Sequence, residues 1–176
     1  MSDRDPVAER RPDWGEPRAK TITWHDPLAA AQIGASMAGI DYLRAMRDGL
    51  LPAPPIGALF GMRLVKVDVG TVTFSCTPDE SAYNPIGLIH GGLVCTLLDS
   101  VLGCAVQSTL PAGVGYASIE IKVNYVRPVH PDGELMAYGR LIKSGRRVAF
   151  AEGDVRNLDE QVVATASGSC LIVTGG

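Results

Sequence analysis

The stretch that decides the fold spans residues 88–109 and reads LIHGGLVCTLLDSVLGCAVQST. Asp99 carries the only formal charge in this segment, and apolar residues fall on almost every side of a helix drawn through it. The segment is too long for one strand, so we expect a helix over residues 91–109, enclosed by other structure. A lone carboxylate buried there costs free energy unless partners satisfy it or chemistry uses it, which makes Asp99 the first candidate for catalysis.

Two glycines stand at the expected start of this helix. Gly91 and Gly92 follow His90, at the end of the helix where backbone N–H groups lack helical acceptors. Without a Cβ in the way, a carbonyl or an anion can approach these donors at the positive end of the helix dipole. The alternative is that both glycines serve only close backbone packing. The spacing alone leaves the two interpretations open.

Six segments have the pattern of strands. Residues 116–126 alternate, with Ala117, Ile119, Ile121 and Val123 on one side and polar residues on the other. Short turns join the last four segments, so we expect an antiparallel sheet. A six-stranded antiparallel sheet wrapped around one long helix, an α+β fold, explains why that helix has no polar face. The expected strands are residues 64–68, 72–76, 116–126, 134–142, 148–155 and 162–173.

The residues before the first expected strand are predicted to form a tail, a helix and a connector. Residues 1–25 lack apolar periodicity and carry three prolines, so we predict a disordered tail. Asp26 and Pro27 are suited to begin a helix over residues 28–47, and a proline-rich connector follows it. The predicted units are therefore the tail (1–25), the helix and connector (26–55) and the main domain (56–176).

The composition excludes several functions. A formal net charge of −3 gives no general attraction to nucleic acid. No segment suits a membrane span, and the charged, proline-containing start is unlike a signal peptide, so we expect a cytoplasmic protein. The 4 cysteines form no CxxC pair and are interpreted as packing residues rather than metal ligands. No glycine-rich loop of the ATP or NAD type occurs, so no cofactor is expected.

Residues 83–92, together with Asp99, resemble the motif of a known family. Asn84 lies six residues before His90, and Asp99 lies nine residues after it. These spacings resemble the hotdog-fold acyl-CoA thioesterases of the PaaI-like, phenylacetyl-CoA thioesterase branch. Residues 115–118 and 124–128 also follow a pattern common in that family. The resemblance covers roughly residues 55–174 and implies the hotdog fold, here with an extra N-terminal helix.

The resemblance implies hydrolysis of acyl-CoA thioesters, with an aromatic or medium-chain acyl group, to a free acid and CoA. The Gly91 amide would polarise the thioester carbonyl, and Asp99 would act as general base or nucleophile. In dimers of the family, the acid of one subunit faces the glycine amides of the other. We therefore expect at least a homodimer, assembled into a homotetramer, and acyl-CoA as the substrate partner.

Three further residues are candidates at the catalytic centre. Ser118 occupies the position where the family has a hydroxyl that orients the attacking water, although a strand serine can also have no role. Asn84 either positions the water or thioester or starts a turn, as Asn-Pro often does. His90 is expected to cap the helix or hold neighbouring groups rather than act as a general base. No G-x-S-x-G sequence supports a serine triad.

Other residues are expected to bind the substrate. Arginines after the helix suit the phosphates of CoA because the guanidinium donates hydrogen bonds in pairs, although charges on hairpins are commonly just solvated. Apolar residues near the glycine pair, together with residues of the N-terminal helix, would line the acyl pocket. The expected substrate-binding residues are Tyr83, Leu88, Gly92, Arg127, Arg146 and Arg147.

The alternative hypothesis is a binding protein rather than an enzyme. A hotdog protein could bind acyl-CoA or an acyl carrier protein without catalysis. Asp99 argues against pure binding, because a buried acid beside an acyl pocket weakens apolar packing without benefit to binding. A hotdog dehydratase ranks lower, since those enzymes place their acid and histidine at another spacing.

Overall fold

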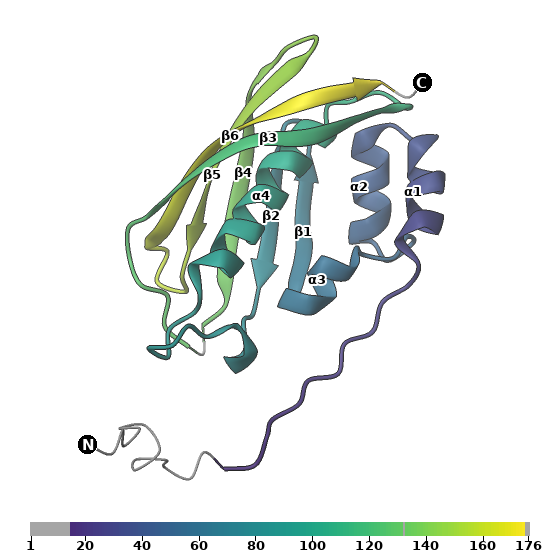
Figure 1. The fold of residues 1–176 in the computed structure, drawn as a ribbon. Coiled ribbons are helices and arrows are strands. Elements are labelled where there is room, and N and C mark those ends of the chain that lie inside the picture. The colour runs from purple at the N-terminus through teal and green to yellow at the C-terminus, as the bar shows by residue number, and fades with distance from the viewer. Residues whose placement is uncertain (1–14, 132, 175–176) are drawn as a thin grey trace, which may run out of the picture.

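One antiparallel sheet forms the body of the molecule in the computed structural model, which describes residues 15–131 and 133–174 (Figure 1). The six strands lie in the order β1-β2-β4-β5-β6-β3. The sequence prediction of an α+β fold with a six-stranded antiparallel sheet is confirmed. The strands are β1 (Met62–Asp68), β2 (Thr71–Cys76), β3 (Val114–Tyr125), β4 (Leu135–Ser144), β5 (Val148–Arg156) and β6 (Val162–Thr174).

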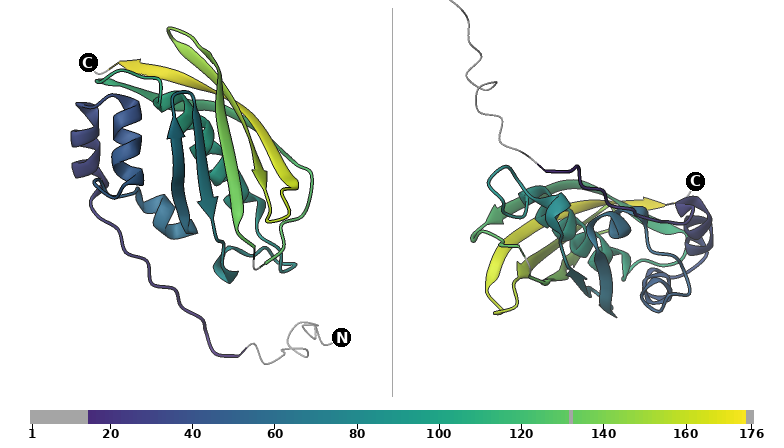
Figure 2. Two further views of the ribbon diagram at one scale, coloured as in Figure 1. Left: turned by 180° about the vertical axis from the view of Figure 1, so that it is seen from behind. Right: turned by 90° about the horizontal axis from the view of Figure 1, so that it is seen from below.

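The long helix α4 (Gly91–Gln107) lies in the curve of this sheet (Figures 1 and 2). Leu97, Leu98 and Val101 are fully buried and anchor the core between helix and sheet. The backbones approach closely at Gly139, where a Cβ would lie 2.3 Å from the Val101 carbonyl oxygen. Glycine is therefore required there for the helix to reach the sheet.

The face of α4 that points away from the sheet is not covered by the same chain. Thr96 and Ser100 are half-buried there, and Asp99 is exposed. The prediction of a helix enclosed on all sides, with a buried Asp99, is therefore wrong for the single chain. Apart from Asp99, the side chains on this face are small and only moderately polar, so the sequence did not distinguish the face from the apolar residues of the same helix.

The N-terminal region holds more helices than predicted. The single helix expected over residues 28–47 is broken into α1 (Pro27–Ala35) and α2 (Gly39–Arg47), and a short α3 (Pro55–Phe60) follows. Asp26 caps α1 as expected, accepting from the Leu28 amide at 2.9 Å. The break has a tertiary cause, because the Gly39 amide donates to the Leu110 carbonyl just beyond α4. Helices α1 and α2 form a pair beside β1 (Figures 1 and 2).

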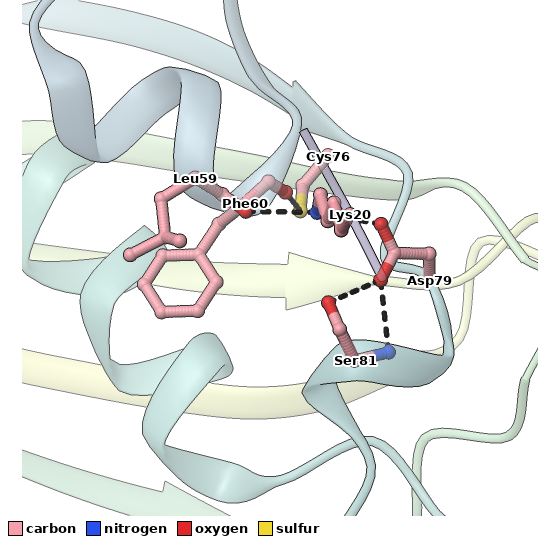
Figure 3. A network of polar contacts seen from close by, with 6 residues as sticks. All are labelled: Lys20, Leu59, Phe60, Cys76, Asp79 and Ser81. Carbon is pink, nitrogen blue, oxygen red and sulfur yellow. Dashed lines mark hydrogen bonds and ion pairs between the residues drawn. The ribbon is translucent and has the colours of Figure 1, made fainter. Parts of the chain in front are cut away.

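A polar contact holds the segment that precedes α1. The Lys20 ammonium lies 2.6 Å from an Asp79 carboxylate oxygen and donates to the Leu59 carbonyl at 3.0 Å (Figure 3). Asp79 also accepts from the Ser81 amide at 2.9 Å. Residues 15–26 therefore form an extended segment that Lys20 attaches to the domain, whereas the predicted disorder of residues 1–14 lies outside the described residues.

The division into residues 26–55 and a main domain of residues 56–176 stays a prediction. Helix α2 packs against β1, so the two predicted units share contacts. Within residues 15–131 and 133–174, no helix is long and apolar enough to cross a membrane.

Candidate active site

The structure joins two of the predicted catalytic residues. The Ser118 hydroxyl on β3 donates to the Asp99 carboxylate on α4 at 2.8 Å. Asp99 lies eight residues into the helix, so the dipole of its own helix N-terminus acts on it only weakly. Ser118 is therefore placed to orient the carboxylate.

A bulge in β3 explains why Ser118 points toward the helix. Ser118 pairs with Cys170 on β6, but Glu120 pairs with the next residue, Ser169, so Ile119 is an extra residue on β3. The predicted uninterrupted alternation placed Ser118 and Ile121 on opposite faces of the sheet, and this is wrong. The bulge turns both residues toward α4.

A pocket of about 400 Å³, here called the proximal pocket, opens beside Asp99. Its wall comes from α2, α3, β1 and β2, and it includes Ile56, Leu64 and Phe74. Residues of the N-terminal helices contribute to it, as the sequence predicts for an acyl pocket. Tyr83 and Leu88 do not line this pocket in the single chain, because they lie in the loop before α4, two turns away from Asp99.

The start of α4 presents one free backbone donor. His90 is the N-cap, and its Nδ1 accepts from the Gly92 amide at 2.8 Å. The Gly91 amide has no hydrogen-bond acceptor among the residues that the structure describes. The structure therefore gives His90 the capping role and engages Gly92, and it leaves the Gly91 amide without an acceptor among the described residues.

Tyr125 contacts this helix start, and sequence reasoning assigned it no role. Its hydroxyl donates to the Gly91 carbonyl at 2.9 Å, and its ring would lie 3.1 Å from a Cβ at Gly91. Tyr125 thus fixes the peptide that follows the free amide. The only signal in the sequence is an aromatic residue in the expected strand, a common feature that does not indicate such a contact.

Asn84 shapes the loop that leads to His90. Its side-chain oxygen accepts from the amides of Ile86 at 3.1 Å and Leu88 at 3.0 Å. This arrangement supports the turn interpretation of Asn84. Its amide oxygen is engaged in the loop, so any contact with a ligand would have to use the amide nitrogen.

Gly91 and Asp99 of one chain are too far apart to act on one carbonyl group. Eight residues of helix correspond to roughly 12 Å along the axis, at about 1.5 Å per residue. Reacting atoms must come within about 3–3.5 Å of one another. A site that uses both groups therefore needs Gly91 from one chain and Asp99 from another.

The predicted phosphate-binding arginines do not gather in one place. The Arg127 guanidinium donates to the Val162 carbonyl at the beginning of β6. The Arg147 carbonyl accepts from the Ile172 amide near the end of the same strand, and Arg146 precedes it in the β4–β5 hairpin. All three side chains are exposed, but they lie at opposite ends of the sheet.

The thiols near Asp99 are held protonated. Burial, together with the negative charge of Asp99, raises the pKa of Cys104 to about 12. The same two causes raise the pKa of Cys170. In the described ranges no three His, Cys, Asp or Glu side chains lie together as metal ligands would. The candidate polar groups of the site are therefore the Asp99 carboxylate, the Ser118 hydroxyl and the Gly91 amide.

A sheet wrapped around one long helix, with an acid on the open face of that helix, defines a hotdog-fold protein. The family model of the thioesterase superfamily matches residues 86–164, a range that contains Gly91, Asp99 and Ser118. Over this range, which is less than half of the chain, the chain is similar to the thioesterase superfamily. The predicted resemblance to the hotdog thioesterases and the predicted hotdog fold are confirmed.

Individual relatives and solved structures show the same similarity. Acyl-coenzyme A thioesterase 13 of Mus musculus is 32% identical over 79 residues, which span 45% of this chain and 56% of that relative. This chain thus covers little more than half of the curated relative. A phenylacetic acid degradation-related protein from Ralstonia eutropha superposes with a TM-score of 0.69 and 28% identity, covering 74% of this chain and 98% of that chain. The E. coli PaaI protein, at 18% identity, shares the fold with a TM-score of 0.67 over 84% of this chain and 96% of its own.

Proposed function

We propose that this chain hydrolyses acyl-CoA thioesters to a free acid and CoA, at sites shared by two copies of the chain. The observation that carries the proposal is the Asp99 carboxylate, held by Ser118 at 2.8 Å beside a mainly apolar pocket of about 400 Å³, whose lining also includes Arg47 and Arg63. The similarity to an acyl-coenzyme A thioesterase supports a CoA ester as the substrate. An aromatic or medium-chain acyl group fits the apolar lining.

The Gly91 amide polarises the thioester carbonyl. The thioester carbonyl oxygen accepts from this N–H at the positive end of the 17-residue helix α4. The amide is fixed in advance, since His90 caps the helix and Tyr125 holds the Gly91 carbonyl. A fixed donor aimed at developing negative charge lowers the barrier without reorganisation during the reaction.

Asp99 promotes attack on the thioester carbon in one of two ways. As a general base it takes a proton from water while the water oxygen bonds to the carbonyl carbon, and the C–S bond then breaks. The departing CoA thiolate recovers that proton. As a nucleophile Asp99 bonds to the carbonyl carbon, the C–S bond breaks and CoA leaves as the thiolate, and water then hydrolyses the resulting anhydride to the free acid and the Asp99 carboxylate. In both cases the Ser118 hydroxyl engages one carboxylate oxygen and leaves the other for the reaction.

The edge strand β3 supports the dimer. Its 12 residues pair with β6 alone in the part of the chain that the structure describes. Ile119 is 58% exposed there, and Tyr125 is 55% exposed. A long, unpaired, partly apolar edge is a template for another strand. Pairing with β3 of a second copy would bring the open faces of the two α4 helices together and cover Asp99.

The wider assembly follows the family resemblance. We propose a cytoplasmic homotetramer built from two such dimers. Arg127 lies just after the end of β3, and Arg146 and Arg147 lie in the opposite hairpin. Antiparallel pairing of two β3 strands would bring the hairpin of one chain toward the helix start of the other. CoA phosphates would then meet arginines from both chains.

A substrate panel tests this function. Phenylacetyl-CoA, hexanoyl-CoA and palmitoyl-CoA are given to the wild type and to Asp99→Asn, with release of the CoA thiol as the measurement. We expect turnover by the wild type and a loss of more than about a hundredfold in Asp99→Asn, equal to about 2.7 kcal/mol of barrier. Asp99→Asn must keep the wild-type melting temperature. Tight binding of acyl-CoA without any turnover by the wild type would contradict catalysis and indicate a binding protein.

A further inference from the structure

A second hollow adjoins the proximal pocket on the side away from β2. This distal pocket has a volume of about 610 Å³ and lies between α1, α2, the end of α4 and the beginning of β3. Its lining includes Ala31 and Gly34 from α1 and Gly115 from β3. Neither α1 nor α2 lies within the range matched by the family model, so the N-terminal region of this chain supplies half of the residues that line this pocket.

Four residues line both pockets and form the boundary between them. They are Met46, Pro54, Cys104 and Tyr116. The Tyr116 ring is fixed against α4, because a Cβ at Gly103 would lie 2.1 Å from its hydroxyl oxygen. Met46 is half-buried, and its unbranched side chain can adopt several rotamers. Met46 is therefore the part of the boundary that can move aside.

The lining of the distal pocket suits hydrocarbon. None of the residues that line it carries a formal charge, and Gln107 is the most polar side chain among them. The walls from α1 are small, with Ala31, Gly34 and Ala35 leaving room beside the helix. A pocket without charge offers nothing to the phosphates of CoA, but it removes methylene groups from water.

We infer that the two pockets form one acyl channel that begins at Asp99, passes Met46 and ends against α1. The N-terminal helices then set the length of the acyl chain. The preferred substrates are thioesters of unbranched acyl chains longer than the proximal pocket alone can hold, rather than of short acyl chains. This inference rests on the proposed thioester hydrolysis and adds the substrate class.

The channel predicts a length dependence that can be measured. Each methylene that enters the distal pocket raises kcat/KM about fourfold, which corresponds to roughly 0.8 kcal/mol of apolar transfer. The rise should continue from octanoyl-CoA to longer chains, because the added carbons pass Met46. An enzyme limited to the proximal pocket would show no gain beyond the chain that fills it.

Filling the distal pocket tests the inference. Ala31 is exposed on α1 and lines the pocket, so Ala31→Phe adds bulk there without disturbing the core. Gln32→Phe is the matched control, since Gln32 is exposed on the same helix but does not line the pocket. Values of kcat/KM are measured for butanoyl-, octanoyl-, dodecanoyl- and palmitoyl-CoA, with melting temperatures for all variants.

We expect Ala31→Phe to lower kcat/KM for palmitoyl-CoA more than about tenfold, which corresponds to the loss of roughly two buried methylenes. The value of kcat/KM for butanoyl-CoA should stay within about twofold of the wild type. Gln32→Phe should match the wild type for every chain length. Met46→Ala, which widens the passage, should raise the ratio of palmitoyl- to butanoyl-CoA turnover.

Other outcomes overturn the inference. They are an equal loss for short and long chains in Ala31→Phe, an equal effect of Gln32→Phe, or a wild type that hydrolyses butanoyl-CoA without favouring longer chains. In these cases hydrolysis itself stands. A wild type that hydrolyses no acyl-CoA of any length would instead refute the proposed function, and the channel with it.

Discussion

Two inactive variants of this chain should restore activity when they share a dimer. Gly91→Pro removes the free N–H donor with little cost to the helix, because proline is favoured at the first helical position. His90 has φ −64° and ψ 134°, the extended conformation that a residue before proline prefers. Gly91→Ala is the matched control. It adds the same Cβ, 3.1 Å from the Tyr125 ring, but keeps the N–H.

The size of the effect follows from the geometry. Removal of one such donor costs about 10²–10³ in kcat, and loss of the Asp99 carboxylate should cost at least as much. In one chain Gly91 and Asp99 lie roughly 12 Å apart, so each site takes one group from each copy. When Gly91→Pro and Asp99→Asn are mixed in equal amounts, about half of the two-fold symmetric dimers contain both variants. One of their two sites is intact, so the mixture should recover about a quarter of wild-type activity.

The assay is the release of the CoA thiol after the two variants are unfolded together and refolded. Each variant refolded alone provides the baseline, and Gly91→Ala should lose far less activity than Gly91→Pro. A mixture no more active than its components would refute a site shared between copies. Equal losses in Gly91→Ala and Gly91→Pro would show that the added Cβ, not the missing N–H, causes the defect.

Three other perturbations have defined outcomes. Ser118→Ala should lower kcat about tenfold with little change in KM in steady-state kinetics, since it removes a hydrogen bond to the Asp99 carboxylate worth about 1.4 kcal/mol. Gly139→Ala should lower the free energy of unfolding in urea by about 1–3 kcal/mol, because its Cβ would overlap a carbonyl of α4; an unchanged value would contradict the close approach. The hydrogen bond from Lys20 lowers the pKa of Asp79 from 3.8 to about 2, so its stabilising effect is complete above pH 3.8 and is lost as the pH falls toward 2. The melting temperatures of the wild type and Asp79→Asn should therefore converge over that pH range, and a constant difference would refute the linkage.

The elements with strong local patterns were predictable from the sequence. The start of α4 at Gly91 and the positions of all six strands follow from periodicity, and the structure places them within a few residues of the expected bounds. The spacing of Asn84, His90 and Asp99 indicated the resemblance to the hotdog thioesterases. These features depend on residues close together in the chain, and such residues determine local structure directly.

The features that the sequence did not predict depend on contacts between distant segments. The break before α2 follows from the contact between Gly39 and Leu110, and the bulge at Ile119 depends on the register with β6. Tyr125 reaches Gly91 across 34 residues of chain. The exposure of Asp99 in one chain is also non-local, because the covering surface belongs to a second copy in our proposal.

Gly139 on β4 and its pairing partner on β5, Gly153, have a consequence for saturation mutagenesis. A Cβ at Gly153 would lie 2.5 Å from the Tyr138 carbonyl oxygen, so neither position accepts a side chain without displacing backbone. In a screen that scores only turnover, these two positions would rank beside Asp99 as intolerant, although neither touches a substrate. A parallel score for protein abundance separates the two kinds of position: the glycine variants would lose abundance, and the Asp99 variants would keep it.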